Sequence, residues 1–205
     1  MDTSNQNQLY HRQHNGLTCI IDIDGCLNSY PDCWVDFVNN EVSGPGKIYR
    51  IPFTNLQEIK ESLSYQGYKN LKIKYRESEF KANLEPTPDA KPALDALKEK
   101  GYRIVVMTAR PVEDHPSLYK TTPEWFTKKD IPYDAIIYSR KKQVQAMVEF
   151  PTAKFIVEDN RKTANLLAKF GFKVYLKNNK YNQGELLLGV KRIDSLLEIE
   201  EVSND

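Results

Sequence analysis

Several classes of protein are excluded by what this 205-residue sequence has little of. It contains only three cysteines, spaced seven residues apart with no C-x-x-C pair, so neither a disulfide framework nor a cysteine zinc site is indicated. No apolar run approaches membrane-spanning length. The net charge is only +1, which gives no global attraction for nucleic acid or membranes. We therefore expect a cytoplasmic protein with no membrane partner.

The composition is that of an ordinary globular protein, with 40% hydrophobic and 28% charged residues. A chain of this length can build one sizeable core and a small additional module. Residues 1–15 are rich in Asn, Gln and His and lack the apolar centre of a secretory signal, so we expect a flexible N-terminal tail there.

The most informative motif is an Asp-Ile-Asp-Gly sequence that begins at Asp22, directly after the apolar run 17–21. Side chains alternate along a strand, so Asp22 and Asp24 leave the strand end on the same side and can face one metal ion and one substrate. A calcium loop of the EF-hand kind needs an oxygen ligand and a glycine where this chain has Cys26 and Leu27. Calcium binding of that kind is therefore excluded.

From about Pro88 onward, short apolar strands alternate with amphipathic helices, which predicts an α/β fold with a parallel sheet covered on both faces. The expected strands are 17–21, 102–107, 133–138, 154–157 and 172–176, and the expected helices are 89–100, 123–129, 141–149 and 162–170. Apolar residues at helical spacing between Val190 and Ile199 predict a closing helix. We assign residues 16–28 and 87–205 to this core.

Residues 29–86 interrupt the alternation and predict a small inserted cap. Between Lys47 and Lys81 there are eight basic and four acidic residues, interleaved with six aromatic ones. Such a segment could hold a nucleotide by charge and stacking, or it could be a solvated face over a small apolar core, and the sequence does not choose between the two. The stretch Gly44–Lys47 is not a phosphate-binding P-loop, because it lacks the first glycine, the Ser or Thr, and the preceding strand.

Polar residues follow the predicted strands at the carboxyl edge, where open parallel sheets bind ligands. The candidates are the phosphate-binding residues Thr108, Ala109 and Arg110, the cations Lys141 and Lys142, and the acidic residues Glu158 and Asp159. The Thr108 hydroxyl and nearby backbone N–H groups can hold phosphate oxygens. The second acidic pair would complete a site for a hard metal ion that prefers oxygen ligands.

In this order, the motifs resemble the haloacid dehalogenase superfamily of aspartate-nucleophile phosphatases, over residues 17–27 and 88–182. The resemblance implies a Rossmann-like core with a cap inserted after the first strand. It also implies the roles of Asp22 as nucleophile and Asp24 as general acid and base. The other implied roles are phosphate binding by Thr108 and by Lys141 or Lys142, and Mg²⁺ ligation by Asp22, the Asp24 carbonyl and Asp159, with Glu158 assisting.

The chemistry requires this combination of groups. A phosphate monoester is anionic, so the Asp22 carboxylate can attack it only if magnesium and a lysine first neutralise the phosphoryl oxygens. The attack would form a phospho-aspartate that water then hydrolyses. Adjacent lysines at a helix start point about 100° apart, and spacing alone cannot choose between them, although we prefer Lys142.

Two branches of the superfamily look closest. Residues 108–111, 157–160 and 180–182 resemble the 5'-nucleotidase and deoxyribonucleotidase branch. The 3'-phosphatase domain of bacteriophage polynucleotide kinase is similar to residues 119–125, 131–133, 158–161 and 171–175. We expect a magnesium-dependent phosphatase of a small substrate, a nucleotide, with a polynucleotide 3'-phosphatase as the alternative. A third hypothesis is a module that binds nucleotides or nucleic acid without turnover. Tyr181 and Asn182 could line the site or end a strand, and we favour the strand end.

Overall fold

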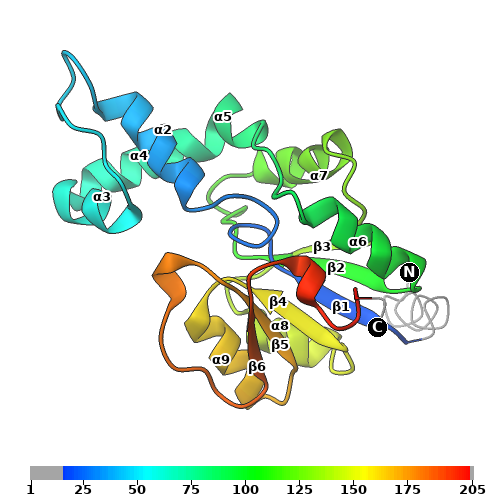
Figure 1. Ribbon diagram of the computed structural model, residues 1–205. Helices are drawn as coiled ribbons and strands as arrows, with labels where there is room; N and C mark the ends of the chain where they lie inside the picture. Colours follow the sequence, from blue (N-terminus) through cyan, green and yellow to red (C-terminus); the bar gives the residue numbers. More distant parts are fainter. Residues whose placement is uncertain (1–15, 204–205) are drawn as a thin grey trace.

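The computed structural model describes residues 16–203 (Figure 1), so the tail expected for residues 1–15 lies outside the described residues. Its centre is a six-stranded, all-parallel sheet with the order β3-β2-β1-β4-β5-β6. The strands are β1 (Thr18–Ile21), β2 (Arg103–Thr108), β3 (Ala135–Tyr138), β4 (Phe155–Glu158), β5 (Val174–Lys177) and β6 (Val190–Ile193). The predicted α/β class and the Rossmann-like parallel sheet are confirmed.

Helices cover both faces of the sheet (Figure 1). Helices α6 (Ala90–Glu99) and α7 (Leu118–Lys128) pack on one face, and α8 (Lys142–Glu149) and α9 (Arg161–Lys169) on the other. In β1, Cys19 and Ile21 join the apolar cluster under α6 and α7, whereas Ile20 joins the cluster under α8 and α9. Burial on both faces explains why the strands are continuous apolar runs in the sequence. Within residues 16–203, no helix has the length and apolarity to cross a bilayer.

The position of β1 decides where a ligand can bind. This strand lies in the middle of the sheet, with β2 on one side and β4 on the other. The order of the strands reverses between β1 and β4, and open sheets bind ligands outside the carboxyl ends of the strands at such a point. The residues at or directly after these three ends are Asp22, Thr108 and Glu158, so residues far apart in the sequence meet at one edge.

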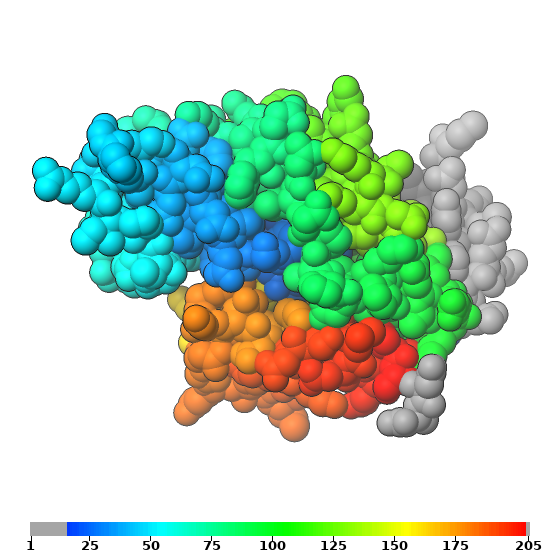
Figure 2. Space-filling model, turned by 45° about the horizontal axis from the view of Figure 1, so that its top comes forward, coloured from blue at the N-terminus to red at the C-terminus, as the bar shows by residue number. Residues whose placement is uncertain are grey.

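Residues 29–86, here called the insertion, form a separate group of helices beyond the carboxyl ends of the strands (Figure 1). Its helices are α2 (Asp32–Val42), α3 (Leu56–Ser62), α4 (Tyr65–Glu77) and α5 (Glu79–Ala82). In Figure 2 the insertion, coloured blue to cyan, projects beside the rest of the molecule. It has an apolar cluster of its own, in which Trp34, Phe53 and Tyr75 are buried. Many of its aromatic side chains therefore build a small core.

The predicted closing helix is wrong. Val190–Ile193 forms strand β6, which pairs in parallel with β5 at the edge of the sheet, and a short 3-10 helix, η2 (Leu196–Glu198), follows. The Ser195 hydroxyl caps η2 by accepting a hydrogen bond from Leu197 N. The apolar positions therefore come from two short elements. Their combined spacing imitates a helix, while the free backbone edge of β5 favours another strand.

Candidate active site

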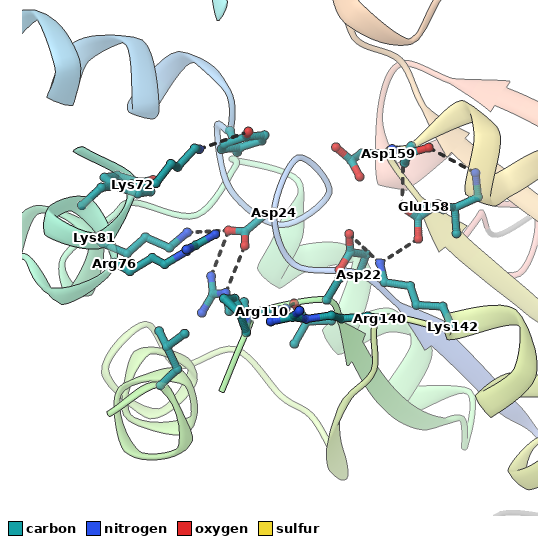
Figure 3. Close-up of a pocket in the computed structure, with 18 of the residues that line it drawn as sticks. Asp22, Asp24, Lys72, Arg76, Lys81, Arg110, Arg140, Lys142, Glu158 and Asp159 are labelled. Atoms are coloured by element: carbon teal, nitrogen blue, oxygen red, sulfur yellow. Dashed lines mark hydrogen bonds and ion pairs between the residues drawn. The ribbon is translucent and has the colours of Figure 1, made fainter. Parts of the chain in front are cut away.

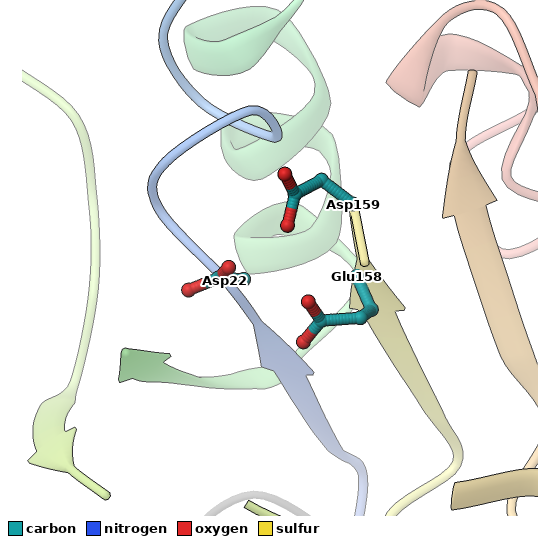
Figure 4. Close-up of side chains that lie close together, drawn as sticks. All are labelled: Asp22, Glu158 and Asp159. Carbon is teal, nitrogen blue, oxygen red and sulfur yellow. The ribbon is translucent and has the colours of Figure 1, made fainter. Parts of the chain in front are cut away.

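Three carboxylates meet at the carboxyl edge of the sheet (Figure 4). One oxygen from each of Asp22, Glu158 and Asp159 lies within 4.8 Å of the others, and all three residues are buried. Asp22 follows β1, and its backbone N–H donates to Val157 O of β4 at 3.0 Å. This bond fastens the two strand ends together. Burial, then the charges of Asp22 and Glu158, raise the pKa of Asp159 to about 9.

Lys142 lies between two of these carboxylates. Its Nζ is 2.8 Å from Asp22 Oδ2 and 2.8 Å from Glu158 Oε2. Burial lowers the pKa of this lysine, but the two carboxylates outweigh that effect and the net shift is upward, so it stays a cation. Lys141 is exposed and does not line the cavity. Of the two lysines that the sequence left open, only Lys142 reaches the acidic cluster.

The oxygens of the three carboxylates differ in availability. Glu158 Oε1 accepts a hydrogen bond from Asn160 N at 3.1 Å and Oε2 pairs with Lys142, so both Glu158 oxygens are engaged. Asp22 Oδ1 is buried and has no hydrogen-bond partner within the described residues. A buried carboxylate oxygen without a donor is costly unless a cation or another donor approaches it. Three hard oxygen donors with one unpartnered buried atom fit a magnesium ion.

Gly25 allows this close approach. Its φ is +89°, a left-handed conformation that glycine adopts without strain. A Cβ atom on Gly25 would lie 2.5 Å from Asp159 Oδ2 and 2.6 Å from Tyr181 Oη. The Tyr181 hydroxyl in turn donates a hydrogen bond to Asp159 Oδ2. The glycine of the motif therefore makes room for the second acidic group as well as forming the turn.

Asp24 points away from the acidic cluster toward cations (Figure 3). Lys81 Nζ of the insertion lies 2.5 Å from its Oδ1, and Arg110 donates to both of its oxygens, at 2.9 and 3.0 Å. Asn28 Nδ2 adds a bond of 2.9 Å. Burial alone would raise the pKa of Asp24, but Arg110 and Lys81 hold it well below its usual range. In this arrangement, Arg110 binds a carboxylate.

The remaining candidates border the same cavity, which has a volume of about 310 Å³. Thr108 is buried at the end of β2, and its Oγ1 accepts a hydrogen bond from Arg110 N at 3.3 Å. Ala109 is exposed and lies along the cavity wall. The structure therefore brings all the predicted site residues except Lys141 to one cavity between the sheet edge and the insertion.

Sequence reasoning missed three contributors. Lys81 reaches Asp24 from the insertion, but nothing in its local sequence separates it from the seven other basic residues there. Tyr181 and Asn182, for which we favoured a strand end, instead lie in the short 3-10 helix η1 (Lys180–Asn182) after β5. Both contact Asp159, Tyr181 at Oδ2 and Asn182 at the backbone oxygen. Their place after a strand that neighbours β4 was the signal that could have identified them.

The sequence has relatives among nucleotidases. The family model described as "5' nucleotidase, deoxy (Pyrimidine), cytosolic type C protein" matches residues 17–202. A nucleotidase of Clostridium acetobutylicum is 25% identical over 182 residues, which cover 83% of this chain and 84% of that protein. YqfW of Bacillus subtilis, which carries the provisional name of a nucleotidase, is 32% identical over 118 residues. That match covers 57% of this chain and 58% of YqfW, so it spans little more than half of either protein.

Solved structures support the fold. A haloacid dehalogenase (HAD) hydrolase of family IA from Entamoeba histolytica superimposes with a TM-score of 0.54 at 16% identity, over 91% of this chain and 97% of that chain. At this identity, the likeness shows the fold alone. The family match spans both the strand ends and the insertion, and it confirms the resemblance seen in the motifs. The chain therefore belongs to the family of 5' nucleotidase, deoxy (pyrimidine), cytosolic type C proteins and is a phosphatase of the haloacid dehalogenase superfamily.

Proposed function

We propose that this protein is a magnesium-dependent phosphomonoester hydrolase that acts on a nucleotide through a phospho-aspartate on Asp22. The observation that carries the proposal is the state of the Asp22 carboxylate. One of its oxygens pairs with Lys142, and the other is buried and has no hydrogen-bond partner among residues 16–203, in a residue that clusters with Asp159. A carboxylate held this way has one oxygen oriented by a cation and one left for a metal ion or for attack.

We assign magnesium to the side chains of Asp22 and Asp159, which lie in one cluster, and to the main-chain carbonyl of Asp24, a ligand that the family resemblance implies. Glu158 contributes mainly by fixing Lys142, because both of its oxygens are engaged. Bound magnesium would neutralise part of the negative charge on the phosphoryl group. Lys142 would neutralise another part, since its ammonium lies 2.8 Å from the attacking carboxylate.

The reaction would proceed in two steps. An Asp22 oxygen attacks phosphorus, the bond from phosphorus to the leaving oxygen breaks, and Asp24 gives its proton to that oxygen. In the second step Asp24 takes a proton from water, whose oxygen attacks phosphorus and releases phosphate and the Asp22 carboxylate. The two steps together consume one water molecule and leave both carboxyl groups as they began.

Asp24 can act as an acid only if its surroundings change when substrate binds. Arg110 and Lys81 favour its ionised form, which cannot donate a proton. An incoming phosphoryl group offers these cations another anionic partner. We expect Arg110 to shift from Asp24 toward the phosphoryl group, which would let Asp24 take up a proton and would give Arg110 the phosphate-binding role expected from the sequence.

The insertion would act as a cap that selects a small substrate. It contributes Lys81 to the site and closes one side of a cavity of about 310 Å³, which is in the range of small-molecule sites. A strand end of nucleic acid would need an open groove. A nucleotide therefore suits the geometry better than the alternative, a polynucleotide 3'-end.

The test is a hydrolysis assay of the full chain with magnesium. The panel contains nucleoside 5'- and 3'-monophosphates, sugar phosphates and 3'-phosphorylated oligonucleotides, and released phosphate is measured. We expect the nucleoside monophosphates to be the best substrates. The Asp22→Asn variant should lose at least about a thousandfold in turnover while keeping its melting temperature within a few degrees. The matched control is Asp95→Asn, at a half-exposed position on α6, which should behave as wild type.

Turnover by Asp22→Asn near the wild-type rate would disprove the nucleophile. Binding of nucleotides without any turnover by the wild type would favour the non-catalytic binding module.

A further inference from the structure

The cavity contains a second charged region that the proposed chemistry does not use. Lys72 and Arg76 are four residues apart on α4 of the insertion, so they lie on the same face of that helix. Both line the cavity that Asp22 lines from the sheet edge (Figure 3). The two side chains therefore border the part of the cavity that belongs to the insertion.

These two cations differ from the others around the cavity in having no carboxylate partner. The ion pairs of the others are Lys142 with Asp22 and Glu158, Lys81 and Arg110 with Asp24, and Arg140 with Asp114. Within residues 16–203, no carboxylate lies within 4.0 Å of the charged atoms of Lys72 or Arg76. Arg76 instead contacts His115 Nε2 at 3.3 Å through one nitrogen.

Aromatic rings hold Lys72 in place. Its Nζ lies 3.9 Å from the ring centroid of Trp34 and 4.8 Å from that of Tyr30, and it donates a hydrogen bond to Tyr30 Oη at 3.3 Å. Because Trp34 is packed in the core of the insertion, the lysine is fixed relative to the cavity. Burial lowers the pKa of Lys72 to about 7, and a bound anion would offset that cost.

We propose that Lys72 and Arg76 form a second anion subsite, which binds a second phosphate group on the leaving-group side of a small substrate. The inference rests on the proposed function, since the first phosphate must lie at Asp22. Two cations without countercharges match an anion better than they match a neutral base, which offers only hydrogen bonds. The preferred substrates are then small bisphosphates, of either a nucleoside or a sugar.

Matched pairs of substrates test the subsite. The full chain with magnesium is assayed on thymidine 5'-monophosphate against thymidine 3',5'-bisphosphate, and on a sugar monophosphate against the corresponding bisphosphate. We expect kcat/KM for the bisphosphate to exceed that for the monophosphate by about tenfold or more, as for one or two charge-assisted hydrogen bonds. The pair with the larger ratio identifies the nucleoside or the sugar as the source of the second phosphate.

Variants assign the preference to the two residues. In Lys72→Met and Arg76→Gln, the ratio of bisphosphate to monophosphate kcat/KM should fall toward one. The control is Lys74→Met, which removes a charge from the same helix at an exposed position where Lys74 pairs with Glu41. It should keep the wild-type ratio. Because each ratio is taken within one variant, a general loss of activity does not imitate the effect.

A binding measurement covers the case in which one variant folds poorly. Calorimetry with thymidine 3',5'-bisphosphate and the Asp22→Asn protein should show affinity about tenfold or more tighter than for the same protein with Arg76→Gln added. Equal ratios in wild type and both variants, or equal affinities, would overturn the subsite while leaving the phosphatase intact. So would a preference for 3'-phosphorylated oligonucleotides over the small bisphosphates. Absence of turnover on every substrate would instead count against the proposed function.

Discussion

The two sides of the cavity differ in charge and are built in different ways. The charged residues that line it from the insertion are all cations, whereas the sheet edge carries both acids and cations. The sheet edge contributes the buried carboxylates of Asp22, Glu158 and Asp159, while the insertion contributes Lys72, Arg76 and Lys81. The acids follow strands that are paired with each other through backbone hydrogen bonds. The cations lie on helices α4 and α5, which pack on an apolar cluster separate from those of the sheet.

This difference suggests a division of labour. Groups at the ends of paired strands keep their mutual distances, which chemistry on phosphorus requires. Groups on a separate set of helices can move as a body relative to the sheet, which suits recognition and closure. Changes at the sheet edge should therefore affect the chemical step, and changes on the insertion should affect which substrate is used.

The largest effect that would test this comparison is expected at Lys142. Lys142→Met should reduce kcat/KM by about a hundredfold or more, because a cation beside the attacking carboxylate is lost. It should also lower the free energy of unfolding by on the order of 3 kcal/mol, since Glu158 remains buried without its partner. Steady-state kinetics and urea unfolding measure the two effects. Lys141→Met, at the exposed neighbour, should change neither, and equal losses in both variants would contradict the assignment.

A smaller effect is expected at the glycine of the motif. Gly25→Ala and Gly101→Ala both place alanine at a positive φ, +89° and +80°, which costs about 1–2 kcal/mol in each case. Only at Gly25 does the new Cβ meet Asp159 and Tyr181, whereas nothing lies within 4 Å at Gly101. Thermal unfolding should show a larger loss in Gly25→Ala than in Gly101→Ala, because the clash adds to the backbone cost, and the assay should show a drop in activity in Gly25→Ala alone. Full activity in that variant would mean that the close approach does not matter.

Magnesium should stabilise the fold through the sheet edge. A ligand that binds only the folded state raises stability with its concentration, so about 2–3 kcal/mol is expected at a hundred times its dissociation constant. For this chain that corresponds to about 5–10 °C in melting temperature. Asp159→Asn should lose most of this gain. Without magnesium the variant should be at least as stable as wild type at pH 7. Folding of the wild type must protonate the Asp159 carboxyl, whose pKa rises to about 9, and asparagine does not carry that cost. An equal rise in melting temperature with magnesium in wild type and in Asp159→Asn would mean that the ion binds elsewhere.

The smallest effect on activity is expected at a site remote from both walls of the cavity. Asp89 accepts hydrogen bonds from Lys177 Nζ at 2.9 Å and from Leu196 N at 2.7 Å. Burial opposes ionisation, but these bonds outweigh it and lower the pKa of Asp89 to about 2. The ionised Asp89 carboxylate therefore adds to the free energy of unfolding. This contribution is present above the pKa of the carboxyl in the unfolded chain, near 4, and is lost as pH falls toward 2.

Asp89→Asn should therefore cost on the order of 2 kcal/mol at pH 7, with the difference from wild type shrinking between about pH 4 and pH 2. Chemical unfolding across that range measures it, and activity at pH 7 serves as the control. A difference that does not depend on pH would show that the hydrogen bonds, and not the ionised form, account for the effect.

The sequence predicted the sheet better than it predicted the site. Runs such as 17–21 and 154–157 were recognisable because burial on both faces leaves strands wholly apolar, and the polar residues after them were visible for the same reason. The closing helix predicted between Val190 and Ile199 was wrong, because a strand and a short 3-10 helix together place apolar residues at helical spacing. Tyr181 was misjudged because its partner, Asp159, is 22 residues away in the sequence.

By itself, the sequence determined the class of fold, the acidic residues at the strand ends and the resemblance to aspartate-nucleophile phosphatases, because all of these depend on local patterns. Only the tertiary structure decided that Lys142 and not Lys141 reaches Asp22, and that Lys81 and Arg110 hold Asp24. It also decided that Lys72 and Arg76 line the cavity with no carboxylate partner in the described part of the chain. These choices depend on the direction of a side chain and on the packing of separate helices, which local spacing does not encode.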